Sequence, residues 1–178
     1  IVSLSQILTQ EVQAQQLLSR AERGELKLIP ENRTVGETFQ ALETVFRHHP
    51  VTVGKGLLFR GEDGVAIHTD HRLLVRILVN MVKNALEATK EGGDVEIAFH
   101  REGEPGNGGV GKGGVFTVRN KGVMTEATQR QIFTRSFSTK GEPGRGLGTY
   151  SMRLFGEEYL GGKVEFESSL EAGTVFRF

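Results

Sequence analysis

Two asparagines stand four residues apart in a segment, residues 70 to 89, where the apolar pattern predicts a long helix begun by Asp70 as N-cap. Asparagine costs a helix about half a kcal/mol relative to alanine, and a covered amide needs a hydrogen-bond partner. An amide oxygen suits Mg²⁺, which binds few protein oxygens and shares its shell with phosphates. A structural amide that caps a neighbouring loop is the alternative. The two asparagines are Asn80 and Asn84. They share one helix face with three other residues at spacings of four, three, four and three: the face carries Leu73, Ile77, Asn80, Asn84 and Glu87.

A second group of residues suits phosphate binding. Glycines alternate with other residues directly before a helix that we expect to start near residue 148, and the free N–H groups of such a junction attract anions. An ordinary glycine turn is the alternative, and the ending of a P-loop is absent. The residues are Gly144, Arg145, Gly146, Leu147, Gly148 and Thr149.

The segment just before these glycines alternates aromatic and polar residues. Phe133 and Phe137 could anchor a mobile flap, while Lys140 and Arg145 reach an anionic ligand.

The elements that must position these residues follow from periodicity. We expect helices at about 1–23, between 29 and 51, at 70–89, 126–135 and 148–160. We expect strands at 26–29, 51–53, 94–100, 114–119, 163–168 and 174–178, a hairpin over 57–68, and a floppy glycine-rich insertion before residue 114. This order predicts an α/β two-layer sandwich, in which a mixed β-sheet is covered on one face by helices.

The first 24 residues form a separate unit in this interpretation. Their apolar residues follow heptad spacing, as in a coiled-coil-like helix, and an amphipathic helix lying on its own domain is the alternative. The chain starts at Ile1 rather than Met, so we expect it to be part of a longer protein.

The composition argues against several classes of binding partner and site. With 22 basic and 22 acidic residues, the chain offers no electrostatic reason to bind nucleic acid or an anionic membrane. It contains no cysteine for disulfides or thiolate metal sites, which suits the cytoplasm, and its five histidines lack metal-ligand spacing. No run approaches 18 apolar residues, although the parent protein could still be membrane-anchored.

Taken together, these motifs resemble the ATPase family that joins histidine kinases, gyrase-type topoisomerases, Hsp90 chaperones and MutL repair proteins. The resemblance covers residues 25–178 and is closest to the histidine kinases. Residues 80–88 resemble the N box, in which Asn84 would ligate Mg²⁺, and Asn80 replaces the glutamate base of the hydrolysing members. Residues 131–140 and 144–148 resemble the F and G2 boxes that frame a lid over ATP, and Thr174 would lie near the adenine.

Three positions depart from that pattern, Asn120, Met124 and Glu87. The family's Asp-x-Gly-x-Gly appears as Asn120-Lys121-Gly122-Val123-Met124, so Asn120 would accept the hydrogen bond of the adenine amino group without charge assistance. We expect weaker or less adenine-selective binding, by about one to two kcal/mol. Met124 would place a bulky thioether near the base. Glu87 replaces a basic residue common in kinases, which leaves Lys83, Lys140 and Arg145 to neutralise the nucleotide.

The resemblance implies an ATP-dependent protein-histidine kinase that uses ATP and Mg²⁺. The acceptor would be a histidine outside this chain, on a helical hairpin of a homodimer, and a response regulator would receive the phosphoryl group. No histidine precedes His48, so residues 1–24 resemble the second helix of that hairpin. The alternatives are a nucleotide-binding pseudokinase or scaffold module, and a phosphatase-biased kinase or Hsp90-like switch.

Overall fold

The computed structural model describes residues 4–101, 113–135 and 146–178. Its elements, in chain order, are α1 (Leu4–Glu22), β1 (Glu31–Thr34), α2 (Val35–Phe46), the 3₁₀ turn η1 (Pro50–Thr52), β2 (Gly56–Arg60), β3 (Ala66–Thr69), α3 (His71–Ala88), β4 (Asp94–Arg101), β5 (Gly114–Asn120), α4 (Glu126–Gln131), α5 (Gly148–Arg153), the π-helix η2 (Leu154–Tyr159), β6 (Glu165–Ser169) and β7 (Gly173–Arg177).

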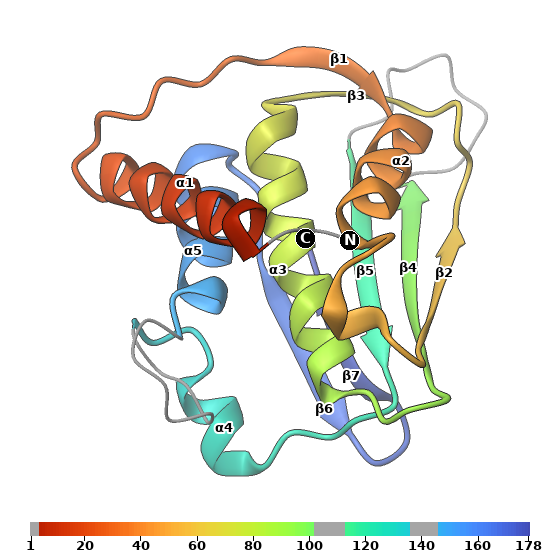
Figure 1. Ribbon diagram of the computed structural model, residues 1–178. Coiled ribbons are helices and arrows are strands. Elements are labelled where there is room, and N and C mark those ends of the chain that lie inside the picture. The colour runs from red at the N-terminus through yellow and green to blue at the C-terminus, as the bar shows by residue number, and fades with distance from the viewer. Residues whose placement is uncertain (1–3, 102–112, 136–145) are drawn as a thin grey trace.

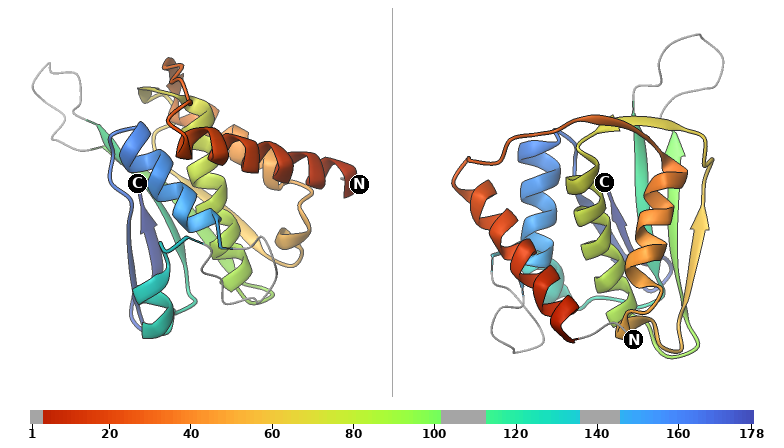
Figure 2. Two further views of the ribbon diagram at one scale, coloured as in Figure 1. Left: turned by 90° about the vertical axis from the view of Figure 1, so that its left-hand side faces the viewer. Right: turned by 45° about the horizontal axis from the view of Figure 1, so that its top comes forward.

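A five-stranded sheet forms the centre of the molecule, in the order β2-β4-β5-β7-β6. The β2–β4 pair is parallel and the other pairs are antiparallel. Helices α2, α3 and α5 lie side by side on one face of this sheet (Figures 1 and 2). Fully buried side chains such as Leu78, Ile97 and Val118 fill the space between the two layers. The predicted two-layer α/β sandwich with a mixed sheet is therefore confirmed.

Helix α3 is the crossover between the parallel strands β2 and β4, a connection that such strands require. It begins where predicted, because the carboxylate of Asp70 accepts hydrogen bonds from the N–H groups of Arg72 and Leu73. Asp70 also accepts from the N–H group of Ile29, which ties the segment before β1 to this helix. The N-terminal end of the helix is thereby fixed in place.

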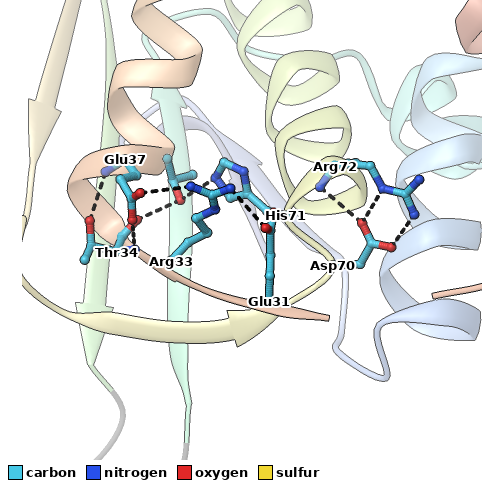
Figure 3. A network of polar contacts seen from close by, with 8 residues as sticks. Glu31, Arg33, Thr34, Glu37, Asp70, His71 and Arg72 are labelled. Carbon is cyan, nitrogen blue, oxygen red and sulfur yellow. Dashed lines mark hydrogen bonds and ion pairs between the residues drawn. The ribbon is translucent and has the colours of Figure 1, made fainter. Parts of the chain in front are cut away.

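Charged and polar side chains surround this end of α3 (Figure 3). Burial alone would raise the pKa of Asp70, but the hydrogen bonds from Arg72 and Ile29 outweigh it and hold that pKa below its ordinary value. Arg33 pairs with both Glu31 and Glu37. These ion pairs join β1 to α2, and α2 meets the start of α3 where Thr38 Oγ1 lies 3.3 Å from His71 Nε2.

The predicted hairpin over residues 57–68 is wrong. Strands β2 and β3 both form, but β2 pairs with β4, and β3 pairs with β1 in a separate two-stranded ribbon. The intervening loop runs instead to the start of α2, where the oxygens of Asp63 and Val65 accept the N–H groups of Gly36 and Val35. These bonds satisfy the first free donors of that helix.

Other predicted boundaries also need correction. The strand predicted at 26–29 is irregular, with β1 starting only at Glu31, and residues 50–52 form the turn η1 instead of a strand. Helix α4 ends at Gln131 rather than near residue 135. The helix predicted over 148–160 exists, but its second half is the π-helix η2. The remaining helices and strands lie close to their predicted positions.

The C-terminal half of helix α1 lies on the same domain, whereas its N-terminal half extends away from it (Figure 2). Leu18 and Ala21 are buried in the core, and the Tyr159 hydroxyl on η2 donates to the Ala21 oxygen at 2.7 Å. Glu22 forms an ion pair with Arg135. These contacts hold the C-terminal end of α1 on the domain, and the assignment of residues 1–24 to a separate hairpin stays a prediction.

Candidate functional site

A cavity of about 310 Å³ opens between the C-terminal half of α3 and the strands β5 and β7. Its size lies at the lower end of the range for small-molecule sites, about 300 to 1,000 Å³. The side chains of α3, of the loop after β5 and of β7 converge on it. The lining residues are Asn84, Ala85, Ala88, Asn120, Gly122, Val123, Met124, Thr174 and Phe176.

Asn84 is half-buried on α3 and lines this cavity. Its amide makes no hydrogen bond to any other residue in the described part of the chain, so its oxygen can serve a ligand. Within the described residues, no group of three or more His, Asp or Glu could hold a metal ion. A cation here would therefore depend on Asn84 together with the oxygens of a ligand, which is how Mg²⁺ usually binds with phosphates.

Asn80, one turn earlier, does not line the cavity. Its amide is buried and donates to Ser151 Oγ at 3.0 Å, and Ser151 donates in turn to the Gly148 oxygen at 2.8 Å. Asn80 thus links α3 to the first turn of α5. The sequence indicated a polar function for this residue but did not identify the partner.

The end of β5 brings Asn120 to the cavity wall. Asn120 is only 3 % exposed, and its Nδ2 atom has no hydrogen-bond partner in the described structure. Gly122 must be glycine, because a Cβ there would lie 2.9 Å from the Ala88 oxygen and 2.7 Å from Asn120 Nδ2. The loop can therefore pass close to α3 while leaving the amide of Asn120 at the cavity.

Thr174 belongs to a chain of hydrogen bonds beside the cavity. Its hydroxyl donates to the Gly122 oxygen at 2.8 Å and lies 2.8 Å from Ser168 Oγ, which accepts from the Met124 N–H group. The chain fixes the loop after β5 to both strands of the β6–β7 hairpin. Sequence reasoning missed Ser168, although its place opposite Thr174 in the predicted hairpin register could have indicated it.

The remaining predicted site residues lie away from the cavity lining or outside the described residues. Gly146 has a positive φ of 98°, and Leu147 packs against the core. Thr149 is buried and Lys83 is half-buried on α3, and neither residue lines the cavity. Lys140, Gly144 and Arg145 lie outside the described residues, and so does Phe137.

Comparison with known proteins agrees with this geometry. Residues 69–178, which include α3 and every lining residue, match the family described as histidine kinase-, DNA gyrase B- and HSP90-like ATPases. The chain belongs to this ATPase family. Its members bind ATP, so the cavity lies in a nucleotide-binding domain.

Similar curated proteins of this ATPase family are histidine kinases. The chain is 28 % identical to an uncharacterized sensor-like histidine kinase of Rhizobium meliloti over 89 % of its length. It is 32 % identical to the histidine protein kinase DivJ of Caulobacter vibrioides over 78 % of its length. It spans less than a third of either relative, 30 % and 23 % respectively.

Solved structures of the family share the fold. The catalytic domain of histidine kinase ThkA, in a nucleotide-free form, superimposes with a TM-score of 0.68 at 24 % identity, covering 86 % of this chain and 94 % of that one. ThkA in complex with the response regulator protein TrrA superimposes with a TM-score of 0.69 at 22 % identity, covering 97 % of this chain and 48 % of that one. Within the described residues, no helix is long and apolar enough to cross a membrane.

Proposed function

We propose that residues 25–178 are the ATP-binding catalytic domain of a two-component sensor histidine kinase. In this proposal residues 1–24 are the second helix of the hairpin that carries the phosphoacceptor histidine. The domain transfers the γ-phosphoryl group of ATP to that histidine, which lies outside this chain.

One observation supports the proposal above the others. Two side-chain amides line the cavity, Asn84 on α3 and Asn120 at the end of β5, and the buried Nδ2 atom of Asn120 has no hydrogen-bond partner within the described residues. A buried polar atom without a partner costs about 1–3 kcal/mol, and a ligand that bonds to it removes that cost. A nucleotide fits this arrangement, because its base can meet Asn120 while its phosphates and a metal meet Asn84.

The chain's own residues would position the nucleotide and balance its charge. Mg²⁺, when bound, would supply positive charge at the phosphates, with the Asn84 amide as its protein ligand. Lys83, Lys140 and Arg145 would add further positive charge, and the glycines from Gly144 to Gly148 would offer N–H groups to the phosphates.

Transfer to an amino acid suits this chain better than hydrolysis. A water molecule needs a general base, and the amide of Asn80 cannot accept a proton near neutral pH. That amide is also engaged with Ser151 on α5. A histidine brings its own nucleophilic nitrogen and needs only to be placed in line with the phosphoryl group.

The partners follow from this reaction. The acceptor histidine and a response regulator are the expected protein partners, as the complex of ThkA with TrrA supports. The full-length protein would be a homodimer with this domain in the cytoplasm, where ATP is available. We expect no nucleic acid partner and no direct membrane contact of this chain, given its balanced charge.

A nucleotide-binding module that lacks transfer activity is not favoured. The amide of Asn84 still lines an open cavity, and the similar curated proteins are named as kinases. The departure at Asn120 replaces a carboxylate with an amide of similar size in the cavity wall, so it changes the polarity of that wall.

Calorimetric titration of this chain with ATP, with and without Mg²⁺, tests the site. We expect Asn84→Ala to remove the metal-dependent part of the affinity, and Asn120→Asp to leave the ATP affinity unchanged or higher. Asn32→Ala, at an exposed asparagine on β1, is the matched control and should bind like the unmodified chain. Equal binding by all four proteins would contradict the assigned site.

Phosphotransfer is tested separately in the full-length protein with radiolabelled ATP. We expect label on a histidine, recognised by its loss in acid and its stability in alkali, and no label with Asn84→Ala. ATP binding without any labelled histidine would favour the module without transfer activity.

A further inference from the structure

Asn120 is the side chain that could select the nucleotide base. It ends β5, and its backbone is paired in register with Thr174 of β7. The strand pairing therefore does not use the side-chain amide of Asn120. This amide is buried at the cavity wall, and its Nδ2 atom has no partner within the described structure. A buried polar atom without a hydrogen-bond partner at a cavity wall indicates that a ligand supplies the missing partner.

The neighbouring hydroxyl groups have no proton to offer. The single proton of Thr174 is donated to the Gly122 oxygen, so Ser168 must donate its own proton to Thr174. Ser168 already accepts from the Met124 N–H group. Among the described side chains where β5 and β7 meet the cavity, Asn120 is thus the one that can still donate to a ligand.

The amide of Asn120 can also reverse its polarity. A carboxamide holds a donor and an acceptor on one plane, and rotation by 180° about the Cβ–Cγ bond exchanges them. A side chain at position 122 would meet Nδ2 at 2.7 Å, so the glycine there spares the amide that clash. An ionised carboxylate at the same position would only accept.

Purines differ in the polarity of the edge that such a group would read. Adenine carries an amino group at C6 and an unprotonated N1, whereas hypoxanthine and guanine carry an oxygen at C6 and a proton on N1. Side-chain amides and carboxylates discriminate between such donor and acceptor patterns. The amide matches both edges in its two orientations, whereas a carboxylate meets the C6 oxygen with repulsion.

We propose that this cavity binds 6-oxopurine nucleoside triphosphates as well as ATP, with Asn120 donating to the C6 oxygen of the former and accepting from the amino group of the latter. The inference rests on the proposed function, because it requires a nucleotide base in this cavity. Asn120 would then set the base specificity of the domain.

Calorimetric titration with Mg-ATP, Mg-ITP and Mg-GTP tests this inference. ITP is the main probe, since hypoxanthine differs from adenine at C6 and N1 and lacks the extra amino group of guanine. We expect the affinities for ATP and ITP to agree within about tenfold in the unmodified chain. We expect Asn120→Asp to widen the preference for ATP by about tenfold or more, and Asn120→Ala to weaken both nucleotides alike.

The two proposals fail in different ways. Tight ATP binding with ITP weaker by clearly more than about tenfold would overturn the dual specificity and leave the proposed function standing. An unchanged preference in Asn120→Asp would also overturn it. Binding of neither nucleotide would overturn both proposals, and the comparison of ATP with ITP in the unmodified chain stays decisive should a variant fail to fold.

Discussion

The amide of Asn80 donates to the hydroxyl of Ser151 across 3.0 Å, and this hydrogen bond joins α3 to α5. Both side chains are buried, and Ser151 passes the bond on to the backbone of Gly148. The helix that carries Asn84 is thereby fixed to the start of α5. Asn80 therefore supports the geometry of the site from outside the cavity.

Replacing Asn80 should lower stability. We expect Asn80→Ala to reduce the free energy of unfolding by about 1–3 kcal/mol, because it leaves the buried Ser151 without this partner. Urea unfolding followed by circular dichroism measures the change. Asn32→Ala, on the exposed face of β1, should cost much less. Equal losses in the two variants would show that the bond to Ser151 contributes nothing.

A methyl group at Gly122 should damage the nucleotide site. The Cβ of Gly122→Ala would meet the Ala88 oxygen at 2.9 Å and Asn120 Nδ2 at 2.7 Å, so the loop must move away from α3. We expect the ATP affinity to fall by about tenfold or more, a loss of about 1.4 kcal/mol. Gly64→Ala is the control, since its Cβ meets nothing within 4 Å. Equal ATP affinity in both variants would contradict the placement of the cavity.

His71 should make stability depend on pH. Burial, followed by the charge of Arg33, lowers its pKa, against the opposing effect of Glu31, Glu37 and Asp70. As the pH falls below about 6.5, the unfolded chain binds a proton that the folded chain resists. The stabilising effect is therefore complete above that pH and decreases below it.

The measurement is urea unfolding at several values between about pH 7.5 and pH 5. We expect His71→Gln to flatten the decrease in stability seen in the unmodified chain. His100→Gln, at an exposed histidine on β4, should keep the original slope. A slope that survives in His71→Gln would assign the effect to other groups.

The hydrogen bond from the Tyr159 hydroxyl on η2 to the Ala21 oxygen on α1 should stabilise the full chain but not a chain that lacks α1. Tyr159→Phe removes the hydroxyl that donates to the Ala21 oxygen, so we expect a loss of about 1 kcal/mol in this chain. In a chain shortened to residues 25–178, which we expect to fold, the same substitution should have no effect. Equal losses in both chain lengths would show that the hydroxyl acts elsewhere.

The parts of the fold that local signals define were predicted well. Asp70 is a capping residue before an amphipathic run, and it begins α3 in the structure as expected. The β6–β7 hairpin was also predicted, as two strands at 163–168 and 174–178 joined by the short turn from Ser169 to Gly173. The ribbon of β1 and β3 was missed, since Glu31–Thr34 is polar throughout and shows no alternation. Pairing of β2 with β4 depends on contacts across the whole of α3, which no local pattern encodes.

In the site, too, some residues could be predicted from the sequence, whereas contacts between distant residues could not. Asn84 stands out in the sequence as a polar residue beside an apolar helix stripe, whereas Asn120 and Thr174 were named from the resemblance to the family's motifs. All three line the cavity. Ser168 looks like an ordinary hairpin serine until its register with Thr174 is known. Asn80 was recognised as unusual, but its partner Ser151 lies 71 positions later, a separation that helix periodicity cannot bridge.

The position of β7 in the sheet determines when during biosynthesis the site can exist. This strand comes last of the sheet's strands in the sequence, yet it inserts between β5 and β6 and brings Thr174 and Phe176 to the cavity. A nascent chain that has already exposed α3 and β5 still lacks one wall of this cavity. A nucleotide that binds in this cavity, as proposed, would therefore stabilise the finished domain and would not assist its earlier folding steps on the ribosome.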